Sequence, residues 1–207
     1  MSKNLTSVQS LYHLGHATWY DPFRILWTRI VEHTLEKDFL EVLQGSITSK
    51  TKIVEIGCGT GINVRRILSL QKPFTSYLGI DFSPDMLAVA QQKFGRQKHI
   101  SFTEGDATTV ALPKTIDLMI CTWVLSHIPE PSAVVNKCYQ SLGKNGTILL
   151  IFLTKPRWFI SFWFLPLATH LFRSTFVSAE EIEKMQGKKE IKKYACGLAT
   201  FVIVRKI

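Results

Sequence analysis

Three glycines lie within five positions, directly after a short apolar run that contains one acid. The stretch 53–64 reads IVEIGCGTGINV, and its glycines are Gly57, Gly59 and Gly61. Glycines in a turn between a strand and a helix let the chain bend sharply and let a ligand approach the main-chain N–H groups. The spacing therefore indicates a ligand-binding loop at the end of a buried strand.

The acid Glu55, two residues before the first glycine, restricts the ligand that this loop would serve. A dinucleotide fingerprint is G-x-G-x-x-G, whereas residues 57–61 follow G-x-G-x-G. A carboxylate beside the loop would repel a pyrophosphate but would suit a ligand that carries an ammonium group. The pattern therefore favours a ligand with an ammonium group over a dinucleotide.

The loop must be positioned by the strands and helices around it. Short apolar runs alternate with amphipathic stretches from Lys50 onward, which is typical of a parallel sheet with crossover helices. The predicted strands are 51–56, 76–80, 99–102, 116–122 and 146–152, and the predicted helices are 61–71, 84–94 and 131–142. Two more β-like runs flank 195–198, too close together for a crossover helix, so they should pair antiparallel. This predicts an α/β fold with a doubly wound, mostly parallel, seven-stranded Rossmann-like sheet, a C-terminal antiparallel hairpin and ligands at the carboxyl ends of the strands.

The chain of 207 residues has no internal repeat and no linker long enough to separate two units, so a single domain is predicted. Asp21 and Pro22 are suited to begin a helix that ends at Gly45. The expected parts of the domain are an N-terminal helical cap (1–49), a ligand-binding core (50–155), an apolar lid or insertion (156–187) and a C-terminal hairpin (188–207).

Composition and charge restrict the compartment and the partners. The four cysteines form no C-x-x-C pair, so neither a zinc site nor a disulfide framework is predicted. Residues 1–10 lack the features of a secretory signal, and no apolar run reaches the roughly 20 residues that span a bilayer. We expect a cytoplasmic protein, with peripheral contact at a membrane surface left open. The net charge of +9 has two interpretations, a solvated surface or contact with an anionic partner.

Further landmarks follow the glycine loop in order, and with them residues 50–155 resemble the class I S-adenosylmethionine-dependent methyltransferases that act on small molecules or lipids. Their signature is an acid, one apolar residue and G-x-G-x-G, as in VEIGCGTG (54–61). The resemblance implies S-adenosylmethionine as the cofactor. It also implies that Asp81, in LGIDFSPDML, accepts hydrogen bonds from the ribose hydroxyls, and that Asp106, in EGDA, receives the adenine amine. The cofactor-binding residues that it implies are Glu55, Gly57, Cys58, Gly59, Gly61, Asp81, Phe82, Met86, Asp106, Ala107, Cys121, Thr122 and Trp123. From the residues alone, Asp81 could instead help to cap a helix and Asp106 could be a turn acid.

Methyl transfer needs no metal and no protein nucleophile, because the sulfonium of the cofactor already makes the methyl carbon electrophilic. The protein must mainly hold an acceptor in line with the methyl group and exclude water. A base that removes an acceptor proton could be His127, for which a structural role is favoured, or a residue of the segment LYHLGHATWYDP. The candidates in that segment are His13, Tyr20, Tyr12 and His16.

Apolar side chains are crowded in residues 155–176, where WFISFWFL begins at Trp158 and lies between Lys155, Arg157 and Arg173. Three interpretations are open: a lid over a hydrophobic acceptor, an interfacial segment with basic flanks on acidic headgroups, or a buried helix or oligomer contact. The first two predict a hydrophobic small-molecule or lipid-like acceptor, and the second predicts peripheral membrane contact through 157–173.

Two alternative functions remain. The basic C-terminal region prompts a nucleic-acid (RNA) methyltransferase, but the fourth strand lacks the N-P-P-Y or D-P-P-Y tetrapeptide of base-amine methyltransferases, so nucleic acid is not favoured as a partner. A non-catalytic cofactor-binding protein of the same fold is the other alternative. The presence of Glu55, the three glycines and Asp81 argues against it.

Overall fold

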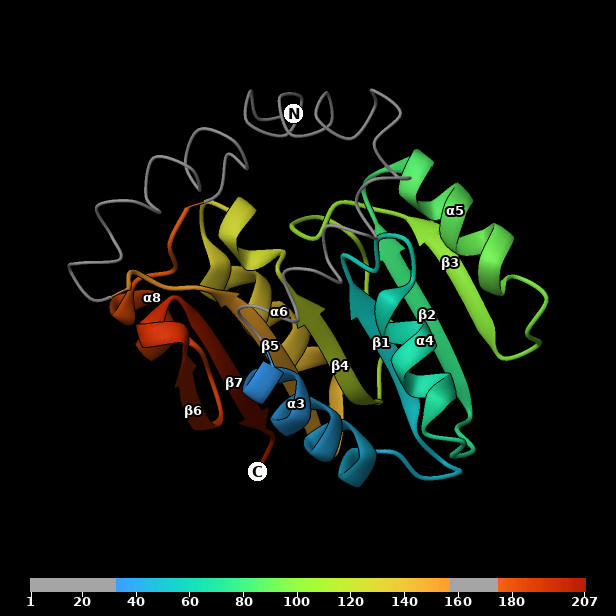
Figure 1. Cartoon of the computed structure of the whole chain (residues 1–207), viewed down its shortest axis with the longest axis horizontal. Coiled ribbons are helices and arrows are strands. Elements are labelled where there is room, and N and C mark those ends of the chain that lie inside the picture. The colour runs from blue at the N-terminus through green and yellow to red at the C-terminus, as the bar shows by residue number, and fades with distance from the viewer. Residues whose placement is uncertain (1–32, 157–174) are drawn as a thin grey trace.

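The computed structural model describes residues 33–156 and 175–207, which form one sheet covered by helices on both faces (Figure 1). The strands are β1 (Lys52–Ile56), β2 (Ser76–Asp81), β3 (Ile100–Glu104), β4 (Ile116–Thr122), β5 (Leu142–Leu153), β6 (Lys188–Tyr194) and β7 (Ala199–Arg205). The helices are α3 (His33–Ser46), α4 (Ile62–Ser69), α5 (Pro84–Phe94), α6 (Pro131–Ser141) and α8 (Ala179–Lys184), with short 3-10 turns η1 (Leu125–His127) and η2 (Ala195–Gly197).

The strand order is β3-β2-β1-β4-β5-β7-β6. Pairs from β3 to β5 are parallel, and β7 pairs antiparallel with both β5 and β6. The predicted α/β fold, with a mostly parallel seven-stranded sheet and a C-terminal antiparallel hairpin, is confirmed. Because the chain order reverses between β1 and β4, the loops after these strands diverge and leave a crevice at their carboxyl ends.

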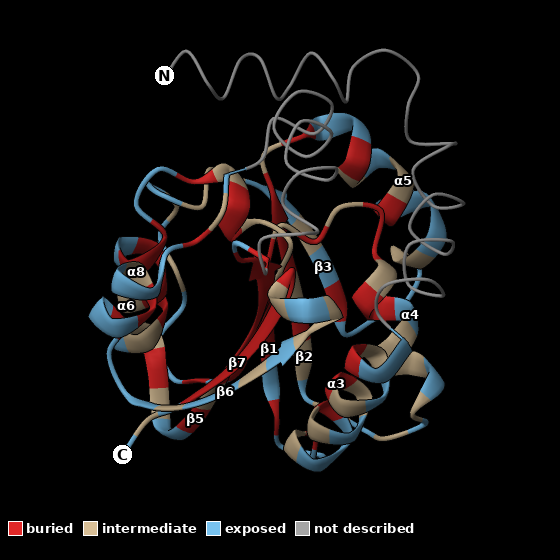
Figure 2. Cartoon of the chain, turned by 60° about the vertical axis from the view of Figure 1, so that its left-hand side comes forward, coloured by how far each residue is buried: buried red, intermediate tan, exposed pale blue. Residues whose placement is uncertain are grey.

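Both faces of the central strands are buried (Figure 2), and successive residues of β1 point into different halves of the core. Val54 and Ile56 pack with the cluster under α6 and α8, whereas Ile53 packs with the cluster under α3 and α4. Burial on both faces explains why the strands read as nearly continuous apolar runs. Glu55 shares the face of Ile53, so the fold places its carboxylate between β1 and α4.

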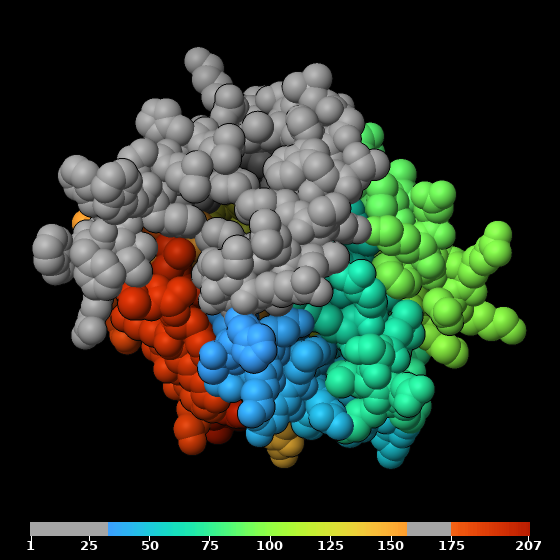
Figure 3. All heavy atoms as spheres, viewed as in Figure 1, coloured from blue at the N-terminus to red at the C-terminus, as the bar shows by residue number. Residues whose placement is uncertain are grey.

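Helix α3 lies between α4 and the C-terminal strands in the space-filling view (Figure 3). It contacts both neighbours through polar side chains. Asp38 accepts hydrogen bonds from the Tyr194 hydroxyl at 2.6 Å and from Lys192 Nζ at 3.4 Å on β6, while Glu36 binds Arg66 of α4. Phe39, on the buried side, meets Phe201 edge to face, with ring centroids 5.9 Å apart.

Some boundaries differ from those predicted. Helix α4 ends at Ser69 instead of residue 71, because the N–H groups of Leu70 and Gln71 bond to carbonyls three residues back and Gln71 adopts a positive φ of 52°. Strand β5 begins at Leu142, four residues early, because Leu142 pairs with Ile116 before an irregularity in the register. The predicted helix start at residue 21 lies outside the described residues.

Helix α8 was not predicted; it falls in the part of the chain expected to be a lid or insertion. The Val177 N–H donates to the Leu153 carbonyl at 2.9 Å, and Ile182 and Met185 are buried in the core cluster with α6. Residues 175–187 are therefore part of the packed domain. No helix in the described ranges is long and apolar enough to cross a membrane.

Candidate functional site

A hollow opens at the carboxyl ends of β1 and β4, at the reversal of strand order. Its lining mixes main chain from the glycine loop with polar side chains from α4 and β4. The lining residues are Glu55, Gly57, Cys58, Gly59, Thr60, Ile62, Asn63, Arg66, Thr122 and Trp123. Such a crevice is where open α/β sheets bind their ligands.

The three glycines of the loop all have positive φ, but their surroundings differ. A Cβ on Gly57 would overlap the Val124 side chain, and a Cβ on Gly61 would come within 2.6 Å of Phe94 Cε2. At Gly59 a Cβ would meet no atom of the described residues within 4 Å. The first and third glycines therefore make room for protein side chains, whereas Gly59 leaves open space beside the hollow for a ligand.

Asp81, at the end of β2, holds the loop in place. Its Oδ2 accepts from the Gly59 N–H at 2.8 Å, and its Oδ1 accepts from the Ser83 N–H at 2.9 Å, just before α5. Burial raises the pKa of Asp81, and these main-chain donors oppose the rise. Asp81 therefore joins the ends of β1 and β2, which accounts for its need to be a carboxylate even before any ligand is considered.

Glu55 is 1% exposed, and two side chains within the described ranges donate to its carboxylate. Asn63 Nδ2 donates to Oε1 at 2.7 Å, and the Tyr77 hydroxyl donates to Oε2. Burial raises the pKa of Glu55 to about 7, while the hydrogen bonds from Tyr77 and Asn63 and the charge of Arg66 lower it. The acid is thus poised to change its charge near neutral pH.

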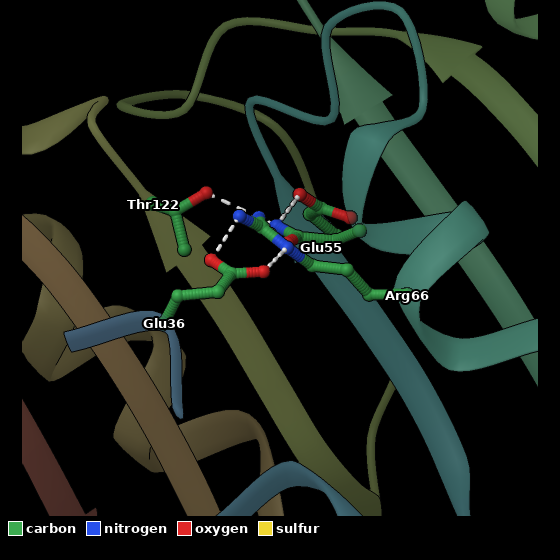
Figure 4. Close-up of polar contacts among 5 residues, drawn as sticks. Glu36, Glu55, Arg66 and Thr122 are labelled. Carbon is green, nitrogen blue, oxygen red and sulfur yellow. Dashed lines mark hydrogen bonds and ion pairs between the residues drawn. The ribbon is translucent and has the colours of Figure 1, made fainter. Parts of the chain in front are cut away.

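Arg66 and Glu36 form an ion pair at the side of the hollow (Figure 4). Arg66 Nε donates to Glu36 Oε1 at 2.7 Å, and Nη2 donates to the other carboxylate oxygen. Nη1 donates to Asn63 Oδ1 at 2.6 Å, and the guanidinium lies 5.5 Å from the Phe39 ring centroid. This arrangement connects α3 to the side chains around Glu55.

The comparisons with known proteins agree with this geometry. Residues 54–148 match a family model described as a methyltransferase domain. The ubiquinone biosynthesis O-methyltransferase of Methylococcus capsulatus is 30% identical over 134 residues, which cover 63% of this chain and 54% of that protein. The phosphatidylethanolamine N-methyltransferase of Cereibacter sphaeroides is 30% identical over 104 residues, 48% of this chain and 49% of that protein.

These matches make the chain similar to the class I S-adenosylmethionine-dependent methyltransferases. Among solved structures, the N-methyltransferase NodS of Bradyrhizobium japonicum, in complex with S-adenosyl-L-homocysteine, has the same fold, with a TM-score of 0.64 and 14% identity over 84% of this chain and 87% of that one. These similarities support the predicted family, its enzyme class and its cofactor. The chain spans about half the length of the curated relatives that it matches.

Six of the predicted cofactor-binding residues line the hollow: Glu55, Gly57, Cys58, Gly59, Thr122 and Trp123. Thr122 Oγ1 accepts from Asn63 Nδ2 at 3.0 Å. Trp123 adopts φ 67°, a strained conformation for a bulky residue, where β4 ends at the hollow.

The other predicted residues lie around the hollow or away from it. Cys121 packs in the core cluster under α6 and α8, where burial holds the pKa of its thiol well above the usual range. Met86 is buried on α5. Asp106 Oδ1 accepts from the main-chain N–H and the hydroxyl of Thr108, both at 2.7 Å, as in a local turn. Phe82 and Ala107 are half-buried.

His127 ends the turn η1, and its main-chain N–H donates to the Val124 carbonyl at 2.9 Å. It is absent from the residues that line the hollow. Its role as a base therefore stays a prediction, as does its favoured structural role. The other candidate bases, Tyr20, His13, Tyr12 and His16, lie outside the described residues. Within those residues no cluster of three or more His, Cys, Asp or Glu side chains could hold a metal ion.

Four residues of the polar network around Glu55 were missed in the sequence: Glu36, Asn63, Arg66 and Tyr77. Asn63 and Arg66 are three residues apart on α4, and this spacing alone predicts that they share a face. Tyr77 precedes Asp81 on an apolar strand and resembles a core aromatic residue. Glu36 carries no local signal, because its partner lies 30 residues away in the chain.

Proposed function

We propose that this protein transfers a methyl group from S-adenosylmethionine to a hydrophobic small-molecule or lipid-like acceptor. The observation that carries the cofactor part is the open space at Gly59, next to a buried carboxylate at the reversal of strand order. A ligand can approach the main chain there and place an ammonium group near Glu55. The names of relatives that act in ubiquinone biosynthesis or on phosphatidylethanolamine support the acceptor part.

The residues present fit the cofactor. Glu55 would accept the ammonium group of the methionine portion, and Asp81 would accept the ribose hydroxyls. Each oxygen of Asp81 already has a main-chain donor, but a carboxylate oxygen has two lone pairs, so a ligand hydroxyl can still donate. Thr122 and Trp123 would line the methionine portion. Phe82 and Met86 would flank the adenine, and Asp106 with the Ala107 main chain would receive its amine.

When bound, S-adenosylmethionine supplies a methyl group that its sulfonium makes electrophilic. The protein then contributes orientation and a dry site, because in-line placement of the acceptor removes much of the entropic barrier. The thiols of Cys58 and Cys121 are unsuited to act as nucleophiles, since burial raises the pKa of both. We infer that segment 157–173 contacts the apolar acceptor or the membrane that contains it.

Radiolabelled cofactor and a cellular lipid extract test the proposal. The purified protein should transfer label to the organic-soluble fraction, and the Gly59→Val variant should not, because its side chain would fill the open space at the loop. Circular dichroism would establish whether the variant is folded. A parallel incubation with total RNA examines the alternative acceptor. Label that enters RNA but not lipid would contradict the proposed acceptor class, and absence of cofactor binding by the unmodified protein would contradict the proposal as a whole.

A further inference from the structure

Among the described residues, Tyr77 and Asn63 donate hydrogen bonds to the Glu55 carboxylate, one to each oxygen. Both are almost inaccessible, with Tyr77 1% and Asn63 2% exposed, and Asn63 lines the hollow together with Glu55. Because each carboxylate oxygen can accept two hydrogen bonds, each can accept one more besides the bond from its described donor. The described donors thus fix both oxygens of Glu55, a lining residue of the hollow, and leave them able to accept from a ligand there.

The orientation of the Asn63 amide follows from its neighbours. Arg66 Nη1 lies 2.6 Å from Asn63 Oδ1, and a guanidinium has donors but no acceptor. The amide oxygen must therefore face Arg66, so the amide NH₂ must face Glu55 Oε1 and Thr122 Oγ1, at 2.7 and 3.0 Å. Arg66 is in turn held by Glu36 of α3. The donor to Glu55 is thus set by a chain of contacts that begins on another helix.

We propose that Tyr77 and Asn63 are positioning residues for cofactor binding, which keep the Glu55 carboxylate ionised and turned toward the hollow so that it can pair with the ammonium group of the cofactor. This inference rests on the proposed function. A buried carboxyl without donors would be neutral at pH 7, and a neutral acid cannot form an ion pair. The two hydrogen bonds favour the charged form.

Other charged groups around Glu55 act in both directions. Arg66 favours ionisation, whereas the charge of Asp81 opposes it, and together with burial they leave the pKa of Glu55 at about 7. The charge of Glu55 also acts on the thiols of Cys58 and Cys121, and burial raises the pKa of both above the usual range, so these two groups stay neutral near pH 7. Glu36 forms its ion pair with Arg66.

The Tyr77→Phe variant tests the inference, because it removes one donor and preserves the ring. A hydrogen bond to a charged group is strong enough to move the pKa of Glu55 upward by about one to two pH units. With half of Glu55 ionised at pH 7 in the unmodified protein, the variant should bind S-adenosylmethionine about five- to fifty-fold more weakly at that pH. At pH 9 the difference should shrink to about twofold or less, because Glu55 is then mostly ionised in both proteins. The ammonium of the ligand titrates equally with both proteins, so the ratio of their affinities reports only the titration of groups on the protein.

Asn63→Ala should shift the same profile upward, and Glu55→Gln should remove the contribution of this group to the pH dependence. Tyr194→Phe is the matched control, because the Tyr194 hydroxyl also donates to a carboxylate, that of Asp38, away from the hollow. It should leave the pH profile of cofactor binding unchanged. An affinity loss in Tyr77→Phe that is equal at every pH would show a purely structural role and overturn the inference.

A second measurement separates this inference from the proposed function. Carbon-13 NMR of labelled Glu55 in the cofactor-free protein reports its pKa without any ligand. An upward shift in both Tyr77→Phe and Asn63→Ala supports the positioning role, and an unchanged pKa in both variants overturns it. The pKa of Glu55 can shift as expected while the unmodified protein does not bind the cofactor at any pH. That result would contradict both the pairing of Glu55 with the cofactor and the proposed function.

Discussion

Alanine substitutions at Gly57 and Gly59 should separate two properties that the glycine loop combines. Both residues have positive φ, 71° and 52°, so alanine at either position adopts a left-handed conformation that costs about 1–2 kcal/mol. At Gly57 the new Cβ also overlaps Val124, and overpacking of this kind adds about 1–3 kcal/mol. Gly57→Ala should therefore destabilise the fold by about 2–5 kcal/mol, and Gly59→Ala by about 1–2 kcal/mol.

Urea denaturation and calorimetric titration with S-adenosylmethionine measure the two effects. For a domain of this size, Gly57→Ala should lower the urea midpoint by about 1–2 M, and Gly59→Ala by clearly less. Cofactor affinity should show the larger specific loss in Gly59→Ala, because its Cβ enters the open space beside the hollow. Equal loss of stability in the two variants would refute the packing argument. Normal cofactor affinity in Gly59→Ala would refute the assignment of that space to the ligand.

Four further outcomes are expected. Asp81→Ala should weaken cofactor binding by about 1–3 kcal/mol in calorimetry, since it leaves ribose hydroxyls and the Gly59 N–H without their acceptor; retained affinity would exclude the ribose role. Phe39→Ala should cost about 3–5 kcal/mol of stability in urea, because the ring is fully buried against Phe201, and a cost below about 1 kcal/mol would contradict that packing. Because the pKa of Glu55 is raised to about 7 in the folded protein, the free energy of unfolding should fall as pH rises from about 4.5 toward 7. Glu55→Gln should reduce that fall, and an identical curve of stability against pH would count against the buried charge. Serine at Trp158, Phe159, Trp163 and Phe164 should spare cofactor affinity and abolish activity on an apolar acceptor, whereas a collapsed thermal transition would show that these residues are core.

The candidate site could be located from the sequence because its main signals are local. The acid and the glycines of residues 55–61 lie on one strand and the turn after it. The alternation of apolar runs with helical stretches predicts the strand and the helix on either side of that turn. The α/β class, the parallel strands and the final hairpin follow from the same periodicities. Boundaries such as the start of β5 were wrong by a few residues, since a pairing with Ile116 that is distant in sequence sets them.

Residues 175–187 show a limit of composition. They were expected to belong to an apolar insertion, yet Ile182 and Met185 are core residues against α6. An amphipathic turn of six residues carries too little periodicity to reveal which surface it will cover. Whether these side chains are buried against α6 depends on where the chain returns after β5.

The sequence by itself determined the fold class and the position of the glycine loop, because both depend on residues that are neighbours along the chain. The tertiary structure alone decided which glycines pack against side chains and which has open space beside it, since Val124 and Phe94 reach the loop from other elements. It also decided how the buried acid is held, because Tyr77, Asn63, Arg66 and Glu36 come from β2, α4 and α3. A carboxylate in an apolar strand is compatible with many partners, and the energy of its charge depends on which donors the fold brings within hydrogen-bond distance.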